Sequence, residues 1–353
     1  MANEYTSESI KVLSAIEHIK TRKGMYIGDA SDARQLLSEV VDNAIDEVQA
    51  GFSDELIVTI DTKANTYTVR DFGRGIPHGM KTLDNGVQKE VLEVLLTVSN
   101  SGGKFDNTSY NYSSGLNGLG ITITNALSKE IVITSYRKGK FVKATAHSSD
   151  KVDIEYGTTT EHDGTEVTFI PDKQHFKHEK IPVDFILDRC KVASALGFRA
   201  RLIVDGEELK TDANMFDLIK EENTTLSTYV NVQPIEVIST TAEKMKVAIR
   251  YTSDTTDRYF GYTNLLSNYL GGTHVQELSR TLVTAWREFI DKHKNIKPAI
   301  ELHNNDYLVG LRAVCAVFIS HTEFSSQTKE KLVVNKAYFD ELMAAFSKAF
   351  TKY

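Results

Sequence analysis

The sequence has only two cysteines among its 353 residues, no Cys-x-x-Cys pair, and ten histidines without the spacing of metal ligands. A disulfide-stabilised secreted domain and a motif-built zinc site are therefore not expected. Cys190 lies in a helical pattern and Cys315 in an apolar strand pattern. We expect two buried thiols in a reducing compartment, with a disulfide as the less favoured alternative.

The chain also lacks any run of about twenty apolar residues and any N-terminal leader in which an apolar segment follows positive charge. We therefore expect no membrane span, no secretion signal and a cytoplasmic location. Positive charge is not in excess either, because 41 Lys and Arg stand against 48 Asp and Glu, for a net charge of −7. A surface that coats DNA generally is not expected, so any DNA contact must be local.

What is present indicates a folded chain of two domains. Hydrophobic residues make up 41% and charged residues 25%, an ordinary globular composition, and the length exceeds that of one typical domain. Residues 211–225 form a polar stretch between the turn at Asp205-Gly206 and the strands beyond Tyr229. We place the domain boundary near residue 220, with a first domain at 1–220 and a second at 221–353.

The most informative helix is predicted over residues 35–50. Its buried stripe consists of residues at three- and four-residue spacing: Leu37, Val40, Val41, Ala44 and Val48. The opposite face carries Glu39, Asn43 and Asp46. Taken alone, such a face is typical of any solvated amphipathic helix.

A β-hairpin is predicted next, over residues 55–60 and 66–72, and it ends at Asp71. Gly73, Gly75 and Ile76-Pro77 follow and allow the chain to turn sharply close to a flat ligand. A carboxylate in that place can accept a hydrogen bond from an exocyclic amine such as that of adenine. An ordinary Asp-x-Gly turn explains the fragment equally well when it is taken alone.

Glycines are dense in residues 101–105 and 113–120, before a predicted helix at 121–127. Backbone N–H groups in such a loop, ending at a helix N-terminus, suit triphosphate oxygens. The loop matches neither the GxGxxG pattern directly after a strand nor the GxxxxGK[ST] pattern.

These motifs in this order resemble the GHKL ATPases: EVVDNAIDE at 39–47, DFGRGIP at 71–77, GGKF at 102–105, GLNGLG at 115–120, and Gly164-Thr165. KGMYIG at 23–28 and SSQTK at 325–329 are similar to the ATPase subunit of type IIA DNA topoisomerases, the gyrase B type. The likeness covers nearly the whole chain. KVLSAIEHIKTRKGMYIG at 11–28 and VTFIPD at 167–172 also resemble the large subunit of a T4-like phage topoisomerase.

The resemblance implies an α+β (α/β) fold. The first domain would be a GHKL (Bergerat) ATPase sandwich with an antiparallel-rich mixed sheet covered by helices. The second would be a transducer domain with a β-α-β core, in which strands 245–251 and 309–319 flank the helix after Gly271-Gly272-Thr273. A closing helix would bury Phe339, Met343, Phe346 and Phe350.

The resemblance also implies roles for single residues. Glu39 would polarise the attacking water, Asn43 would bind Mg²⁺, and Lys329 would contact the γ-phosphate. Asp71 would hold the adenine amine, with Thr165 sharing a water. The remaining ATP contacts would come from Arg74, Gly75, Ile76, Pro77, Gly102, Gly103, Lys104, Tyr110, Gly115, Leu116, Asn117, Gly118, Leu119, Gly120, Gln327 and, across a dimer, Tyr5.

Arg74 would cover the edge of the base and pair with Asp46, and Arg74 and Arg137 match the family's arginines that face coumarin inhibitors. Gln35 departs from the family, because cellular gyrases often carry there a His that orients the glutamate. Phe72 stands where Asp or Asn is common.

In function, the resemblance implies an ATP-operated gate that dimerises on ATP and traps a DNA duplex for strand passage. The chain carries neither the EGDSA and DxD motifs of the cleavage domain nor a tyrosine-bearing breakage domain, so it would act with a separate cleavage domain or subunit. A helix over 275–293 would offer the local DNA contact through its basic residues: Arg280, Arg287, Lys292, Lys294 and Lys297. Ordinary solvated charge on a helix explains these residues equally well.

Three other functions share the ATP motifs. A MutL-like mismatch-repair clamp is the main alternative, but it lacks MYIG and SSQTK. A sensor histidine kinase needs a phospho-accepting His on a helix before the ATP domain, and only His18 precedes Glu39. A heat-shock chaperone of the superfamily would act on proteins.

Overall fold

The structure is a computed structural model that describes residues 13–28, 31–99, 101, 118–178, 180–219, 227–293, 295–296, 298, 300–326 and 328–353. The chain forms two compact units. Of the described residues, those at 13–101, 118–185 and 203–208 belong to the first, and those at 186–202 and 209–353 belong to the second. This division passes through a helix near residue 185 and through a strand near residue 202. It does not test the domain boundary near residue 220, which stays a prediction.

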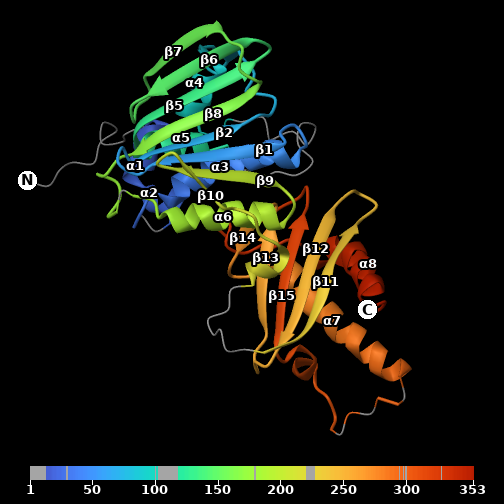
Figure 1. Cartoon of the computed structure of the whole chain (residues 1–353). Coiled ribbons are helices and arrows are strands. Elements are labelled where there is room, and N and C mark those ends of the chain that lie inside the picture. The colour runs from blue at the N-terminus through green and yellow to red at the C-terminus, as the bar shows by residue number, and fades with distance from the viewer. Residues whose placement is uncertain are drawn as a thin grey trace, which may run out of the picture. The chain divides into compact units, whose positions relative to one another are not determined.

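An eight-stranded sheet, in the order β10-β9-β1-β2-β8-β5-β6-β7, organises the first unit (Figure 1). Its strands are β1 (Glu55–Asp61), β2 (Thr66–Asp71), β5 (Ser128–Arg137), β6 (Lys140–Ala146), β7 (Val152–Thr158), β8 (Gly164–Pro171), β9 (Arg199–Val204) and β10 (Glu207–Leu209). From β1 to β7 the neighbouring strands pair antiparallel. A separate hairpin joins β3 (Met80–Thr82) to β4 (Gln88–Glu90).

Helices cover this sheet because its strands bury every second side chain. In β1, Leu56, Val58 and Ile60 are buried while the residues between them are partly exposed. The helices of the first unit are α1 (Ala15–Thr21), α2 (Lys23–Ile27), α3 (Arg34–Gln49), α4 (Val91–Thr97) and α5 (Gly120–Leu127), while α6 (Val183–Ala195) crosses the division after residue 185 and belongs mostly to the second unit. Helix α3 packs against β1 and β2, α4 against β6, and α5 against β5.

Helix α3 differs from the sequence prediction in one respect. The predicted stripe from Leu37 to Val48 is buried, but the polar face is not solvated. Glu39 is 6% exposed and Asp46 is fully buried, and Asn43 is half-buried. Carboxylates removed from water require partners, so this face must serve a site or a hydrogen-bond network rather than solvation.

The second unit is built on a five-stranded sheet in the order β11-β12-β15-β13-β14. Its strands are β11 (Thr228–Ile238), β12 (Lys244–Thr252), β13 (Arg258–Thr263), β14 (Leu266–Asn268) and β15 (Leu311–Phe318). Its helices are α7 (Thr273–Lys292), α8 (Asp340–Phe350) and the short 3-10 helices η2 (Met215–Leu218), η3 (Asn304–Leu308) and η4 (Lys336–Phe339).

The β-α-β core of this unit is present, but one of its strands differs from the prediction. Strand β13 runs parallel to β15, and α7 lies between them in the chain. Strand β12, which the sequence analysis placed beside the helix, pairs antiparallel with β15. The sequence pattern found the helix and the central strand and missed β13 as the parallel partner.

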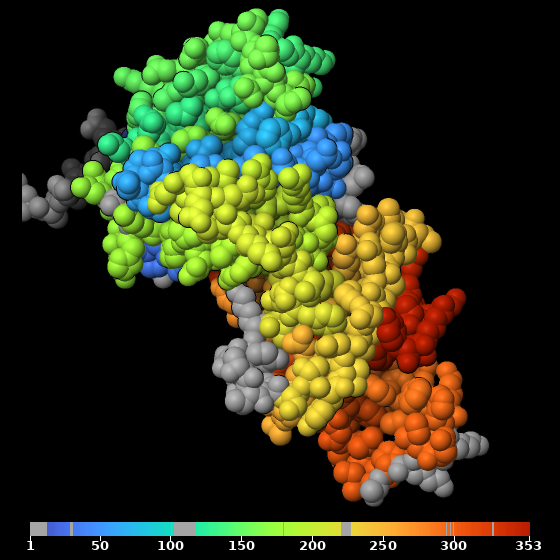
Figure 2. Space-filling model, in the orientation of Figure 1, coloured from blue at the N-terminus to red at the C-terminus, as the bar shows by residue number. Residues whose placement is uncertain are grey.

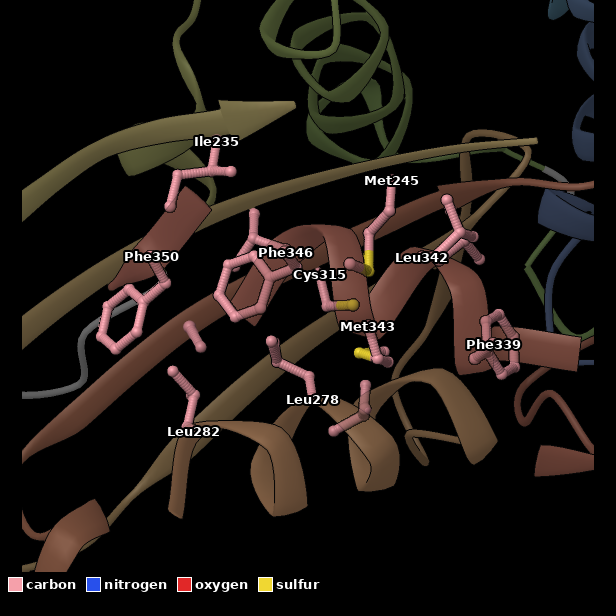
Figure 3. Packing of buried hydrophobic residues seen from close by; sticks show 14 of the residues in the cluster. Ile235, Met245, Leu278, Leu282, Cys315, Phe339, Leu342, Met343, Phe346 and Phe350 are labelled. Carbon is pink, nitrogen blue, oxygen red and sulfur yellow. The ribbon is translucent and has the colours of Figure 1, made fainter. Parts of the chain in front are cut away.

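Helices α7 and α8 enclose the apolar core of this unit. Figure 3 shows Leu278 and Leu282 of α7 facing Phe346 and Cys315, and each of these four side chains is buried. Both cysteines are free and buried, as predicted. Burial raises the pKa of Cys190 to about 12, and burial also raises the pKa of the Cys315 thiol, so neither thiol is reactive near neutral pH. In the described part of the chain, no helix has the length and apolarity needed to cross a membrane.

His274, near the start of α7, predicts a loss of stability in acid. The side chain is fully buried, neither ring nitrogen has a hydrogen-bond partner among the described residues, and burial lowers its pKa from 6.5 to about 3. Between these values the unfolded chain binds a proton that the folded chain does not. The free energy of unfolding should therefore fall as pH drops below 6.5, by about 1.4 kcal/mol per pH unit and about 2 kcal/mol at pH 5.

Urea unfolding followed by the fluorescence of Trp286 measures this loss, because Trp286 is the single tryptophan and packs in the same unit. The variant His274→Leu should flatten the pH dependence between pH 6.5 and 4.5, since its unfolded state gains no proton at that position. The same substitution at exposed His293 is the control and should leave the slope unchanged. Equal slopes in wild type and His274→Leu would refute the assignment.

Candidate functional site

Asp71 ends β2 and lies in the first unit with its carboxyl group almost fully buried, 5% exposed. Its Oδ1 accepts hydrogen bonds from the amides of Gly73, at 2.9 Å, and Thr165, at 3.2 Å. Within the described residues, Oδ2 accepts none. Burial raises the pKa of Asp71 to about 6, with a smaller upward contribution from Glu47 and opposing contributions from both amides and from Arg70. Within the described residues, Oδ2 is therefore the oxygen left for a further donor.

The turn after Asp71 is fixed against strand β5. Gly75 adopts a φ of +65°, and a Cβ there would overlap the carbonyl of Tyr136. The Arg137 guanidinium donates to the Gly75 carbonyl at 2.9 Å, and the Ser135 hydroxyl donates to the Ile76 carbonyl at 2.7 Å. Glycine at position 75 therefore serves the packing of backbone on backbone, in addition to the ligand approach expected from the sequence.

Arg74 is held by Glu47, a residue that the sequence analysis did not single out. The Arg74 amide donates to Glu47 Oε2 at 2.9 Å, and Nη2 lies 2.8 Å from Oε1. The guanidinium also lies 3.8 Å from the ring centroid of Phe52. The sequence prediction named Asp46 as the partner, whereas the ion pair that the structure shows goes to the adjacent carboxylate. A Cβ on Gly73 would collide with Glu47, which explains glycine there.

Glu39 lies on α3 beside the beginning of α5. The amide of Gln35 donates to Glu39 Oε1 at 2.8 Å, and a Cβ on Gly120 would come within 2.5 Å of Glu39 Oε2. Gln35 thus orients the carboxylate, but its neutral amide does not exchange a proton near neutral pH as an imidazole would. A carboxylate in this place can accept a proton from a water molecule at the N-terminus of a helix.

The residues present fit one Mg²⁺ ligand rather than a metal cage. Asn43 lies one helical turn after Glu39 and contributes an amide oxygen. No group of three His, Cys, Asp or Glu residues suited to a metal occurs among the described residues. Mg²⁺ usually keeps several waters and takes one or two protein ligands together with substrate phosphates, so a single Asn is compatible with it.

Much of the predicted phosphate loop lies outside the described residues: Gly102, Gly103, Lys104, Tyr110, Gly115, Leu116 and Asn117, and likewise Tyr5 and Gln327. The structure describes the two ends of the loop. The Ser101 amide donates to the Gly118 carbonyl at 3.2 Å, and α5 begins at Gly120 after Leu119. The loop therefore starts and ends at one place, next to Glu39.

Lys329 belongs to the second unit, whereas Glu39 and Asp71 belong to the first. Its φ is +58° and its side chain is only 7% exposed. Its amide donates to the Ser326 carbonyl at 3.1 Å, and its carbonyl accepts from the side-chain amide of Asn268 at 3.0 Å. The residue is thus fixed in a tight turn beside the end of β14.

The basic residues on α7 are less available for contact with DNA than the sequence suggested, because two of them form ion pairs within the helix. Arg280 pairs with Glu277, and Lys292 lies 3.8 Å from Glu288. Arg287 lies over the ring of Tyr307 at 5.9 Å. These side chains are exposed, and the orange surface in Figure 2 includes part of this helix. Lys294 and Lys297 lie outside the described residues.

Two family models match the chain. The one described as "Histidine kinase-, DNA gyrase B-, and HSP90-like ATPase" matches residues 28–175 and includes Glu39, Asp71 and Thr165. The one described as "DNA gyrase B" matches residues 209–353 and includes Lys329. The predicted fold class, a GHKL ATPase sandwich followed by a transducer domain, is confirmed. The roles of the single residues stay predictions.

The chain is 31% identical to DNA gyrase B of Thermotoga maritima over 97% of its own length and 57% of the relative, and 32% identical to DNA topoisomerase 4 B of Mycoplasma capricolum over 95% and 53%. It thus spans just over half of each relative. The 43K ATPase domain of Thermus thermophilus gyrase B, solved with an aminocoumarin, has the same fold, with a TM-score of 0.72 at 23% identity, covering 96% of this chain and 90% of that one. The chain therefore joins a domain of the GHKL ATPase family to a transducer domain of the DNA gyrase B family.

Proposed function

We propose that the chain binds and hydrolyses ATP as the entrance gate of a type IIA DNA topoisomerase. Two copies would dimerise on ATP and capture a DNA duplex for strand passage. The observation that carries the proposal is Asp71, whose Oδ1 is held by two backbone amides while Oδ2 accepts no hydrogen bond within the described residues. The adenine amine fits this oxygen, with Thr165 sharing a water at the same edge.

Hydrolysis would use Glu39 as the general base. Gln35 orients the carboxylate toward the start of α5, where backbone N–H groups from the loop ending at Gly120 would hold the phosphates. Mg²⁺, held by Asn43 and phosphate oxygens, would neutralise charge on the triphosphate. Lys329, with Gln327 beside it, would contact the γ-phosphate and stabilise charge that develops during transfer.

The partners proposed are a second copy of the chain, a DNA duplex and the DNA-cleavage domain or subunit of the topoisomerase. Arg74 and Arg137, both fixed around the turn at Gly75, would face coumarin-type inhibitors. The location would be the cytoplasm, at the nucleoid or in the host if the gene is of the T4-like phage type. The match of residues 209–353 to DNA gyrase B favours this function over a MutL-like clamp.

If the chain acts as such a gate, its molecular mass in solution should depend on nucleotide. The chain should be monomeric or weakly associated when free and should double its mass from 39.5 kDa with adenylyl imidodiphosphate and Mg²⁺, because the analogue orders surfaces that the free chain lacks. Light scattering with and without the analogue measures this. Deletion of Tyr5 and Lys329→Ala should each reduce the response. A mass that stays constant, or that rises equally in both variants, would reject the gate as placed on these residues.

A further inference from the structure

Arg70, directly before Asp71, is buried next to the proposed adenine site, with 8% of its surface exposed. Its guanidinium lies between two aromatic rings, 4.8 Å from the centroid of Phe72 and 4.6 Å from that of Tyr136. Contact with two rings restricts the rotamers of the side chain, and its N–H donors reach backbone carbonyls. Arg70 therefore has one geometry, and Phe72, which departs from the family, is part of what imposes it.

The edge of this guanidinium joins two segments of backbone. Nη1 donates to the carbonyl of Asp71, and Nη2 donates to the carbonyl of His162 at 2.7 Å. His162 lies two residues before Gly164, where β8 begins and where the amide of Thr165 points to Asp71 Oδ1. The same side chain thus holds both the strand end that carries the carboxylate and the loop that leads into β8, where its amide partner Thr165 lies.

Gly164 shows how closely the two segments meet. Its φ is +140°, and a Cβ there would overlap both the Asp71 carbonyl and Arg70 Nη1. The backbone pairing between β2 and β8 ends at Arg70 and Glu166. Beyond that pair, Arg70 and the Asp71 side chain replace the backbone ladder in holding the strands together.

The charges near Asp71 also link Arg70 to this carboxyl group. The charged groups that act on the Asp71 carboxyl are Glu47 from α3, which raises its pKa, and Arg70 from β2, which lowers it, while β8 contributes the uncharged amide of Thr165. Arg70 is the cation opposing the effects of burial and of Glu47. Removing its charge should raise the pKa of Asp71 further above about 6.

We propose that Arg70 is a positioning residue for adenine recognition, which fixes the Asp71 carboxylate against the Thr165 amide and sets a positive charge near it. The inference rests on the proposed function, since it assumes that Asp71 holds the base. Its role would be exerted through Asp71 and Thr165 and not through direct contact with the nucleotide.

Two substitutions separate the roles of shape and charge. Arg70→Lys keeps the positive charge and loses the planar fork, whereas Arg70→Gln loses the charge as well. Calorimetry with adenylyl imidodiphosphate and Mg²⁺, from pH 5.5 to 8, gives the affinity of each variant relative to wild type at every pH. Protonation of the nucleotide itself affects all variants equally and therefore cancels in that ratio.

Both variants should bind about 10-fold more weakly at pH 8, because a charge-assisted hydrogen bond to a carbonyl is lost. Only in Arg70→Gln should the loss of nucleotide affinity on acidification also begin at a higher pH than in wild type. Arg250→Gln is the matched control: Arg250 stacks on Phe216 in the second unit, so this variant should bind as wild type does.

The outcomes are distinguishable. Wild-type affinity in Arg70→Gln would overturn the inference and leave the proposed function standing. Equal losses at every pH in both variants, with lowered thermal stability, would show a purely structural role and would also overturn it. Absence of binding by the wild-type chain would overturn the proposed function and this inference with it.

Discussion

Replacing Glu39 with Gln should lower the rate of ATP hydrolysis by roughly 10²- to 10⁴-fold, the range for a lost general base, while the affinity for adenylyl imidodiphosphate stays nearly unchanged. The substitution keeps the shape of the side chain against Gly120, and the Gln35 amide retains an oxygen to which it can donate. What is lost is the ability to take a proton from the attacking water. Steady-state phosphate release and calorimetry on the same sample measure the two quantities.

Glu243→Gln is the matched control. Glu243 is also a buried carboxylate that accepts hydrogen bonds, from Ser320 and Tyr338, but it lies in the second unit. The Glu243→Gln variant should hydrolyse ATP at the wild-type rate. Wild-type turnover in Glu39→Gln would show that another group activates the water and that the helix carboxylate is only structural.

Replacing Asp71 with Asn should weaken nucleotide binding by about 5- to 150-fold, equivalent to about 1–3 kcal/mol for a mismatched buried polar pair. The amides of Gly73 and Thr165 both donate to Oδ1, so the Asn oxygen must stay on that side. In the proposed site, the Asn NH₂ group would then occupy the position of Oδ2 and face the adenine amine, donor against donor.

Calorimetry with adenylyl imidodiphosphate measures this loss, and Asp205→Asn is the control, because Asp205 accepts from Thr62 in an exposed turn of the same unit. Unchanged affinity in Asp71→Asn would remove the carboxylate from the adenine site.

The sequence was sufficient to predict the local elements of the site. The spacing of Leu37 and Val41 predicts α3, and the alternation before Asp71 predicts the antiparallel hairpin of β1 and β2. Both patterns depend on periodicity along a short segment, which the sequence contains. The glycine-rich loop likewise leads to α5 at the expected place.

The contact partners of these residues could not be predicted from the sequence, because they depend on packing between distant segments. The ion pair of Arg74 with Glu47 is an example, since it depends on the close approach of the turn at Gly73 to α3. Arg70 is an ordinary strand residue until Tyr136 and the His162 carbonyl arrive from elsewhere in the chain. In the second unit, β13 was missed because its parallel pairing with β15 crosses about fifty residues.

Selectivity between adenine and guanine nucleotides tests the central claim most directly. In the proposed site, the amine of adenine donates to Asp71 Oδ2, whereas guanine presents a carbonyl oxygen at the same position and sets acceptor against acceptor. Calorimetry of the wild-type chain with Mg²⁺ should give saturable one-site binding of adenylyl imidodiphosphate and much weaker binding of guanylyl imidodiphosphate. Equal binding of both nucleotides, or binding of neither, would contradict an adenine site at Asp71.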